Sequence, residues 1–541
     1  MMRLALLLLA LTAGTQTRVD AVFKAYDSVR TPGCALGIFR DGVTAYARGY
    51  GMADLERDVH ITPESVFEVG STSKQFAAAA IALLVHDGKL SFSDDVRRYI
   101  PELPVYGKPI TLNELMWHTS GLRDYTDLLE LAGYGLEQAT TDEQALALIV
   151  RQKSLEFPSG TRYEYSNTNY FLLSVIVKRV SGQTLAAFVQ RRIFAPLGMM
   201  HTLYRTDYAM LIPNRAMGYA PAAGGDFKNS MSNWQQTGDG GVQISVQDAL
   251  KWDENFYHPR VGGPWLVDQL QTTGHLANGK RLGYARGLFI GTYRGLRFVS
   301  HGGAWIGYRA AFDRYPSLHT SIVVFCNSDA APAEALAKSV ADVVLQSHLA
   351  PVATAPPARA KSEISTQGLS GAYIDEAGGD VFHVVSSKGG IALVLSGNTY
   401  ALAPVGPSSF RVGSTLVRFD VAKDGSATAM HVGSGDDEVI AQRFTPVTPA
   451  PEQLAGVAGT YYSPELDVTW TLGVSAGSVR LEPTRNLPDG AAGKLHPQMS
   501  DTFTSDGGGF LIRFTRDSAG AIDGFALSAG RGLRSLVFAR T

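Results

Sequence analysis

The chain has 541 residues, more than a single hydrophobic core usually organises, so we expect two or three domains. Its 48 Lys and Arg residues against 50 Asp and Glu residues leave a formal charge of −2. No run of like charges predicts a surface for nucleic acid or anionic membrane, so small or neutral partners are favoured. The sequence leaves the oligomeric state open, a dimer included.

Residues 1–17 have the layout of a cleavable signal peptide, with one basic residue, an apolar run over 4–13 and small polar residues after it. The run is too short to span a bilayer, so no stable membrane span is predicted. The alternative is a buried N-terminal helix. We expect export, to the periplasm or beyond the cell.

The segment 34–51, "CALGIFRDGVTAYARGYG", has two stretches with the alternating pattern of a β-strand on either side of an Arg-Asp-Gly turn. This pattern predicts a β-hairpin. It contains Cys34, and Cys326 lies in a second strand-like run. An exported chain can join two such cysteines, but cysteines in apolar runs are more often simply buried. The cysteine and histidine spacings predict no metal site.

A helix that is apolar on nearly every face is predicted over 74–86, directly after Ser71. Ser71 and Lys74 are three residues apart and so share one helical face. An amine at this spacing can help to deprotonate the serine, which would make Ser71 a nucleophile. A serine is also a common helix cap, so the spacing alone does not decide between the two.

Two further elements carry residues of the same chemistry. At 163–170, "YEYSNTNY" places Tyr165 and Asn167 in a loop before a second apolar helix, with both side chains on one side of an extended backbone. A phenol beside a lysine can act as a base, and an amide can hold a substrate carbonyl. At 300–305, "SHGGAW" predicts a strand on which two glycines admit a ligand beside His301.

The C-terminal part is a repeat of short strands after a linker rich in proline and alanine at 351–366. The segment 369–376 recurs at 457–464, and 417–425 recurs at 512–520. The two copies predict two small antiparallel barrels or sandwiches, each closing its own core. Ser475, in "GVSAG", fits the motif of an α/β-hydrolase elbow, but a strand rather than a helix follows it, which argues against that role.

These elements, in this order, resemble the serine β-lactamase and penicillin-binding superfamily, and most closely its class C-like branch with the D-aminopeptidases, esterases and some carboxypeptidases. The resemblance covers about residues 18–345 and extends to "LNELMWHTSGL" at 112–122, "IFAPLGMMHT" at 193–202 and "GDGGVQISVQDALKW" at 238–252. It implies an α+β fold, a class C β-lactamase-like domain with an antiparallel sheet flanked by helices over 18–350. Two small antiparallel β-barrel domains would follow, at 367–448 and 449–541.

The resemblance also implies the roles of the site residues. Ser71 would form an acyl-enzyme, with Lys74 and Tyr165 sharing its proton and Asn167 orienting the substrate. The backbone N–H groups of Ser71 and of Ala304, which follows Gly303, would form the oxyanion hole. No cofactor is implied, and His118 has no chemical role that can be derived, so we interpret it as structural.

His301 takes the position that is lysine in the β-lactamases. An imidazole is mostly neutral near pH 7, so the binding of a substrate carboxylate is less favoured than in a β-lactamase. If neutral His301 serves the substrate, activity should fall on the acid side with an apparent pKa of about 6 to 7.

The predicted function is therefore an exported serine hydrolase that cleaves amide bonds of small D-amino-acid compounds or short peptides, as the D-aminopeptidases do. A carboxylesterase, a weak β-lactamase or a penicillin-binding carboxypeptidase is the alternative. A non-catalytic binding or scaffolding protein is the alternative of another class, and the intact set of site residues argues against it. The stretch 482–501 is long for a barrel connection and is predicted to be either a disordered or a functional loop. The resemblance to the D-aminopeptidases implies a loop that reaches the catalytic mouth, where Asp489 would meet a substrate amino group.

Overall fold

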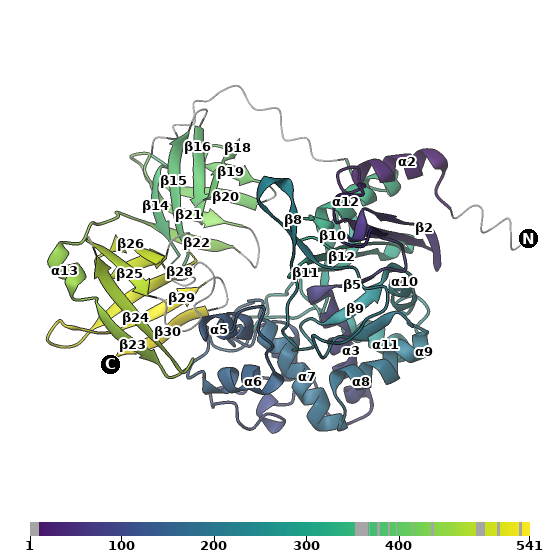
Figure 1. Cartoon of the computed structure of the whole chain (residues 1–541), viewed down its shortest axis with the longest axis horizontal. Helices are drawn as coiled ribbons and strands as arrows, with labels where there is room; N and C mark the ends of the chain where they lie inside the picture. Colours follow the sequence, from purple (N-terminus) through teal and green to yellow (C-terminus); the bar gives the residue numbers. More distant parts are fainter. Residues whose placement is uncertain are drawn as a thin grey trace, which may run out of the picture.

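The structure is a computed structural model of the chain. It describes residues 10–351, 366, 368–375, 379–387, 390–395, 398–413, 415–433, 438–475, 477–482, 493–505, 509–529 and 533–541. The predicted position of Asp489 and most of the linker lie outside the described residues. Figure 1 shows a mixed domain of helices and strands on one side and two units of strands on the other.

The N-terminal domain is built on a six-stranded antiparallel sheet with the order β10-β11-β12-β13-β1-β2. Its strands are β1 Cys34–Arg40, β2 Val43–Tyr50, β10 Phe289–Tyr293, β11 Leu296–Trp305, β12 Tyr308–Tyr315 and β13 Thr320–Cys326. Successive side chains of a strand point to opposite faces, and in the central strands both faces are buried. Leu36 and Ile322 pack with α2 Ala13–Val22 and α12 Ala333–Val344 on one face, and Phe39 and Phe325 belong to the larger core on the other.

The other face of the sheet is covered by helices that surround α3 Lys74–His86. They are α4 Leu112–Met116, α5 Tyr125–Leu131, α6 Asp142–Arg151, α7 Asn167–Ser181, α8 Leu185–Val189, α9 Ala195–Leu197, α10 Val246–Glu254 and α11 Gly263–Leu270. Four consecutive alanines, 77–80, are fully buried in α3, and their small side chains let α7, α8 and α11 approach closely. The predicted helix over 74–86 is therefore the centre of the helical layer.

Short strands complete this domain. They are β5 Val66–Glu68, β6 Thr202–Tyr204 and β9 Val242–Ser245 in one sheet, β3 Met52–Asp54 with β4 Val59–His60, and β7 Tyr219–Pro221 with β8 Phe227–Asn229. β5 leads directly into the turn that carries Ser71. Residues 13–17 of the predicted signal peptide lie in α2, so a cleavage after residue 17 would fall inside that helix.

The first C-terminal unit is a nine-stranded antiparallel sheet with its own apolar core. Its strands are β14 Gly371–Ile374, β15 Val381–Ser387, β16 Gly390–Leu395, β17 Asn398–Ala401, β18 Ala403–Gly406, β19 Ser409–Val412, β20 Thr415–Val421, β21 Ala427–Val432 and β22 Val439–Phe444. The edge strands β17 and β18 are consecutive in the chain but are not paired in the described sheet. The predicted barrel is therefore nearly closed.

The second C-terminal unit is a closed eight-stranded barrel, preceded by α13 Pro451–Ala455. Its strands are β23 Gly459–Ser463, β24 Val468–Ser475, β25 Ser478–Glu482, β26 Gly493–Met499, β27 Thr502–Ser505, β28 Phe510–Arg516, β29 Ile522–Ala529 and β30 Leu533–Arg540. One interpretation is confirmed here, and one changes. Ser475 ends a strand that pairs with the next one, so no nucleophile elbow forms, and the predicted loop 482–501 is too long because 493–499 is a strand.

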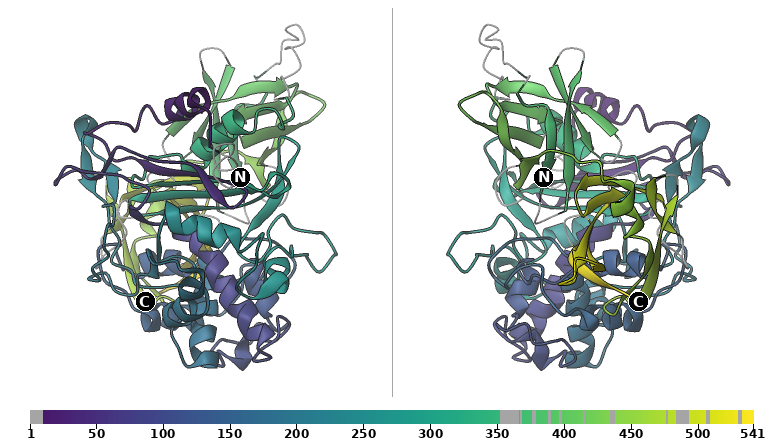
Figure 2. Two further views of the ribbon diagram at one scale, coloured as in Figure 1. Left: turned by 90° about the vertical axis from the view of Figure 1, so that its right-hand side faces the viewer. Right: turned by 90° about the vertical axis from the view of Figure 1, so that its left-hand side faces the viewer.

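The two units share the local structure that the repeat predicts. Tyr373 donates a hydrogen bond to the carbonyl of Leu369 at 2.6 Å, and Tyr461 donates one to the carbonyl of Val457 at 2.8 Å. Figure 2 shows the first unit above the second in both views. The apolar core of the second barrel is continuous with the core of the N-terminal domain, whereas the first unit has a separate one.

Among the described residues, no single helix is long and apolar enough to cross a membrane, and only the bent pair formed by α7 and the segment 185–197 meets the length and composition required. In the same part of the chain, no group of three or more histidine, cysteine or acidic side chains is placed to hold a metal ion.

Cys34 and Cys326 are paired neighbours on β1 and β13 and form a disulfide bond. The bond closes a loop with a sequence separation of 292 residues, so it constrains the unfolded chain strongly. We expect the variant Cys34→Ala/Cys326→Ala to lose about 2–5 kcal/mol of unfolding free energy, measured by urea denaturation. Reductant should lower the stability of the wild type and leave the variant unchanged. Two reactive thiols in the unreduced, denatured wild type would contradict the prediction.

Candidate active site

Ser71 lies on a tight turn between β5 and α3, a 3-10 helix over Gly70–Ser73. The turn is fixed by side chains on both sides: Thr72 Oγ1 donates to the carbonyl of His301 at 3.2 Å, and the N–H of Val242 donates to Ser73 Oγ at 3.1 Å. Gly70 has a φ of +47°, and a Cβ there would lie 3.0 Å from the nitrogen of Ala304. A glycine is therefore required for β11 to approach Ser71.

Lys74 is fully buried and meets Ser71 directly. Its Nζ lies 3.0 Å from Ser71 Oγ, 2.8 Å from Asn167 Oδ1 and 2.8 Å from the carbonyl oxygen of Asp239. Burial lowers the pKa of Lys74 to about 8, although the charges of Asp239 and Asp124 oppose the shift. A neutral amine has two N–H donors, which the amide oxygen and the carbonyl accept. Its lone pair is then left for the proton of Ser71.

Tyr165 is buried beside this pair. The Nζ of Lys74 lies 4.8 Å from the centroid of its ring, and the ring of His118 stacks on it with a centroid distance of 4.2 Å. Burial raises the pKa of Tyr165 well above 10, with only partial opposition from the hydroxyl of Ser71. Tyr165 is thus a neutral phenol at rest, so Lys74 and not a phenolate is the base that the geometry favours.

The sequence predicted Asn167 in the loop before the helix, whereas in the structure it is the first residue of α7. Its backbone N–H donates to Asp124 Oδ2 at 2.7 Å, which ties the start of α7 to the segment before α5. The extended backbone of Ser166 separates Asn167 from Tyr165, and both side chains contact Lys74. The predicted pairing of these two residues is present, with the helix starting earlier than expected.

His301, Gly303 and Ala304 lie on β11, as predicted. The side chain of His301 is buried: Nδ1 lies 2.6 Å from the carbonyl of Gly302, and Nε2 lies 3.0 Å from the hydroxyl of Tyr284. A carbonyl only accepts, so Nδ1 carries the proton and Nε2 accepts from Tyr284. Burial and the charge of Lys74 lower the pKa of His301 to about 3. The expectation that His301 sets an acid limb at pH 6 to 7 is therefore wrong.

Gly303 and Ala304, which follow on β11, lie against the turn that carries Ser71. A Cβ at Gly303 would lie 2.0 Å from the carbonyl oxygen of Val69, so only glycine fits there. Ala304 lines the cleft with Ser71, and the first N–H groups of a helical turn have no partner within it. The oxyanion hole stays a prediction, and the two residues proposed to form it, Ser71 and Ala304, both line the cleft. His301 is not among the residues that line it.

His118 has a supporting role that its sequence context did not reveal. Its Nδ1 accepts hydrogen bonds from the N–H of Ser166 at 3.2 Å and from Asn169 Nδ2 at 3.1 Å. Burial, Lys74 and His301 hold its pKa well below 6.5, so the ring is neutral. With its ring stacked on Tyr165, His118 holds the phenol in place.

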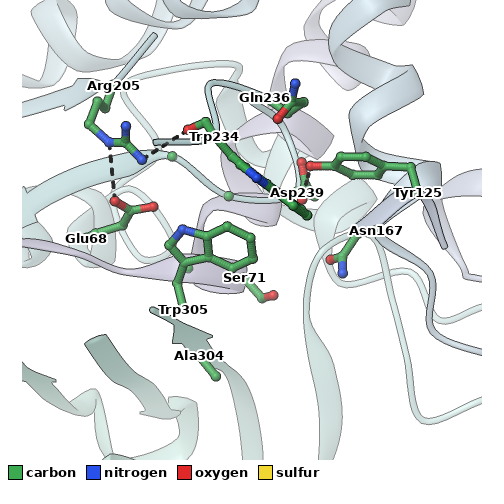
Figure 3. Close-up of a pocket in the computed structure, with 13 residues that line it drawn as sticks. Glu68, Ser71, Tyr125, Asn167, Arg205, Trp234, Gln236, Asp239, Ala304 and Trp305 are labelled. Atoms are coloured by element: carbon green, nitrogen blue, oxygen red, sulfur yellow. Dashed lines mark hydrogen bonds and ion pairs between the residues drawn. The ribbon is translucent and has the colours of Figure 1, made fainter. Parts of the chain in front are cut away.

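A cleft opens in front of Ser71 (Figure 3). Sequence reasoning missed several of the residues that line it: Glu68, Tyr125, Arg205, Trp234, Gln236, Asp239 and Trp305. They come from β5, α5, β11, the residue after β6 and the loop before β9, and only the fold brings these segments together. The sole signal was "GDGGVQ" at 238–243, a stretch matched by the resemblance, which contains Asp239.

Asp239 combines burial with an incomplete set of partners. Its Oδ2 accepts a hydrogen bond from the hydroxyl of Tyr125 at 3.0 Å. Its Oδ1 is buried and has no hydrogen-bond partner among the residues that the structure describes. Burial raises the pKa of Asp239 to about 6, with Lys74 opposing the shift, so the carboxylate is mostly ionised at pH 7. It is a negative charge at the wall of the cleft.

The second acid of the cleft, Glu68, is neutralised by its neighbours. Arg205 Nε lies 3.4 Å from Glu68 Oε2, and Gln243 Nε2 donates to the same oxygen at 2.9 Å. Arg205 also donates to the carbonyl of Trp234 at 3.2 Å. Among the described residues that line the cleft, Asp239 is therefore the acid without an ion pair, although the charge of Lys74 lies close enough to favour its ionised form.

A serine beside a buried amine of lowered pKa is an arrangement that activates the hydroxyl for attack on an acyl group, which defines the class of the serine hydrolases. Residues 19–345 match the Beta-lactamase family, and the chain belongs to that family.

Two kinds of relatives agree with this assignment. A D-aminopeptidase of Cereibacter sphaeroides (strain KD131 / KCTC 12085) is 28% identical over 500 residues, covering 90% of each chain. The octameric penicillin-binding protein homologue from Pyrococcus abyssi is 22% identical and covers 80% of this chain and 98% of its own, with a TM-score of 0.58. A D-amino acid amidase from Ochrobactrum anthropi SV3 is 20% identical and covers 62% of this chain and all of its own, with a TM-score of 0.54. The two structures show that the fold is shared.

Proposed function

We propose that the protein hydrolyses amide bonds of small D-amino-acid compounds or short peptides with a free amino group, through an acyl-enzyme on Ser71. The observation that carries the proposal is the contact of 3.0 Å between Ser71 and an amine whose pKa burial lowers to about 8. Lys74 takes the proton of Ser71 as the oxygen attacks the carbonyl carbon. Tyr165 then relays a proton to the leaving amine, and water releases the acyl group.

The charge of the cleft supports a substrate with an ammonium group. Asp239 offers a buried carboxylate oxygen without a partner among the described residues, and Arg205 is already paired with Glu68. An ammonium beside Asp239 is stabilised, whereas the carboxylate of a β-lactam is repelled. The D configuration is supported by the relatives that are named D-aminopeptidase.

Export is part of the proposal. The disulfide between Cys34 and Cys326 suits an oxidising compartment, and residues 1–17 have the layout of a signal peptide. The proposed location is the periplasm or the medium.

A panel of substrates tests the activity: the p-nitroanilides of D-alanine, L-alanine and N-acetyl-D-alanine, a p-nitrophenyl ester and a chromogenic cephalosporin. We expect the highest kcat/KM for the D-alanine anilide. Turnover of the ester alone, with neither anilide of free alanine cleaved, would make the protein an esterase.

Asp239→Asn tests the recognition of the amino group. The amide is isosteric and keeps an oxygen for Tyr125, but it removes the charge that faces the ammonium. We expect the ratio of kcat/KM for the free D-alanine anilide to that for its N-acetyl form to fall roughly 10- to 100-fold, because a hydrogen bond to a charged group contributes about 1.5–3 kcal/mol. The ratio cancels any change in the reactivity of Ser71. An unchanged ratio would place the amino group elsewhere.

A further inference from the structure

We infer that the second barrel is a working part of the active site, because two of its residues hold the backbone segments that carry Tyr165, Asn167 and Asp124. The inference rests on the proposed role of these residues beside Ser71. It concerns Arg534, at the start of β30, and Glu465, between β23 and β24. Both act as positioning residues, since neither lines the cleft.

The first contact reaches the residue before Tyr165. Arg534 forms a two-pronged ion pair with Glu164, with Nη1 2.9 Å from Oε1 and Nη2 2.6 Å from Oε2. Their side chains are 10% and 9% exposed, so the pair is shielded from solvent. Glu164 also donates its backbone N–H to the carbonyl of His118 at 2.9 Å. The barrel thus contacts and fixes the segment that places Tyr165 against the ring of His118.

The second contact reaches Asn167 and Lys74 through Arg123. Arg123 Nη1 lies 3.1 Å from Glu465 Oε1, and Nη2 donates to the carbonyl of Arg534 at 3.0 Å. The next residue, Asp124, accepts the N–H of Asn167, and the carbonyl of Arg123 accepts from Thr168 Oγ1 at 2.5 Å. Asn167 in turn contacts Lys74. A continuous path of contacts therefore runs from the second barrel through Arg123 and Asn167 to the proposed base.

The network is buried and charged, which makes its geometry specific. Glu156 joins it: Arg123 Nε lies 2.8 Å from its Oε1, and the N–H of Arg534 donates to the same oxygen at 2.9 Å. Two buried guanidinium groups therefore face three carboxylates, and the half-exposed Arg162 lies 3.4 Å from Glu164 at the edge of the interface. Removing one partner of such a network leaves an uncompensated buried charge, so the flanking backbone must move.

The position of the second barrel agrees with this role. Its apolar core is continuous with that of the N-terminal domain, and it lies beside α5 and α6 in Figure 1. All three segments that it holds, around residues 123, 153 and 164, lie in the N-terminal domain. A shift of about 1 Å in a catalytic group, caused from a distance, can lower a rate about 100-fold.

The double variant Arg534→Met/Glu164→Gln removes both charges of the ion pair. Their other partners stay compensated, because Glu156 keeps its pair with Arg123 and the side chain of Arg162 is 40% exposed. We expect a cooperative melt, a kcat for the D-alanine anilide at least tenfold lower, and a KM within threefold of the wild type. The rate at which a fluorophosphonate labels Ser71 should fall in parallel. Arg534→Lys, which keeps the charge but loses the two-pronged geometry, should recover part of the rate.

Arg516→Met is the matched control. It removes an ion pair of the same barrel, with Asp501 at 2.6 Å, that does not contact the N-terminal domain in the described network. It should leave kcat and labelling unchanged. Because the fluorophosphonate is not an amide, its labelling rate tests the inference even if no D-aminoacyl anilide is cleaved.

If the double variant does not fold, the single variant Glu164→Gln tests the inference. The glutamine has the same shape as the glutamate and keeps one oxygen that accepts a hydrogen bond from Arg534. A folded variant of either kind with wild-type kcat and labelling rate would overturn the inference. So would an equal loss in Arg516→Met, because the effect would then belong to the stability of the barrel.

Discussion

Ser71→Ala is expected to lower kcat/KM for amide and ester substrates by about 10³- to 10⁶-fold and to abolish covalent labelling by a fluorophosphonate. The alanine removes the attacking oxygen, and the remaining cleft still binds substrate. Ser71 is the serine whose hydroxyl meets both the amine of Lys74 and the cleft. Intact-mass measurement after labelling, with steady-state kinetics, checks both parts.

Ser475→Ala is the control for this experiment. Ser475 lies in a motif that also suggests a nucleophile, but it ends β24 in a hairpin of the second barrel. Its replacement should leave labelling and turnover unchanged. An adduct that persists in Ser71→Ala, or one that is lost in Ser475→Ala, would assign the nucleophile to another residue.

The parts of the site that are close in sequence could be predicted. Ser71 and Lys74 are one turn apart, so the spacing itself puts the amine beside the hydroxyl. Tyr165 and Asn167 are two residues apart, and the extended backbone of Ser166 between them places both side chains on the same side, as predicted. The α+β fold with two C-terminal barrel-like units is confirmed, because the apolar strands, the buried helix and the repeat each have a strong local pattern.

The residues that the sequence could not place depend on contacts between distant segments. Asp239 comes from the loop before β9 and meets Tyr125, 114 residues away. Arg534 meets Glu164 across 370 residues, and the two halves of that pair have no common motif. The protonation states of Tyr165 and His301 were also out of reach, because both depend on burial, which raises one pKa and lowers the other. The disulfide depended on the register of β1 against β13.

Lys74→Met is expected to lower the labelling rate of Ser71 and kcat/KM by about 10²- to 10⁴-fold, the usual contribution of a general base. Methionine suits a fully buried position, so loss of folding is not the expected cause, and a thermal melt checks it. Lys74→Arg separates base from charge, because a guanidinium stays protonated and cannot accept the proton of Ser71. If Lys74→Arg labels as fast as the wild type, Lys74 acts by its charge alone.

The same role fixes the sign of the pH dependence. Burial lowers the pKa of Lys74 to about 8, and the base is the deprotonated form, so the labelling rate should rise as pH increases towards about 8 and then level off. Below that pH the rate should fall about tenfold per unit, and the fluorophosphonate itself does not titrate there. His301→Asn should leave the position of this limb unchanged, because burial keeps His301 neutral down to about pH 3. A rate that is flat from pH 6 to 9 would remove Lys74 as the base. If the pH limb moves in His301→Asn, the titrating group is His301 and not Lys74. Its protonation would then have to act on Ser71 through Tyr284, its hydrogen-bond partner.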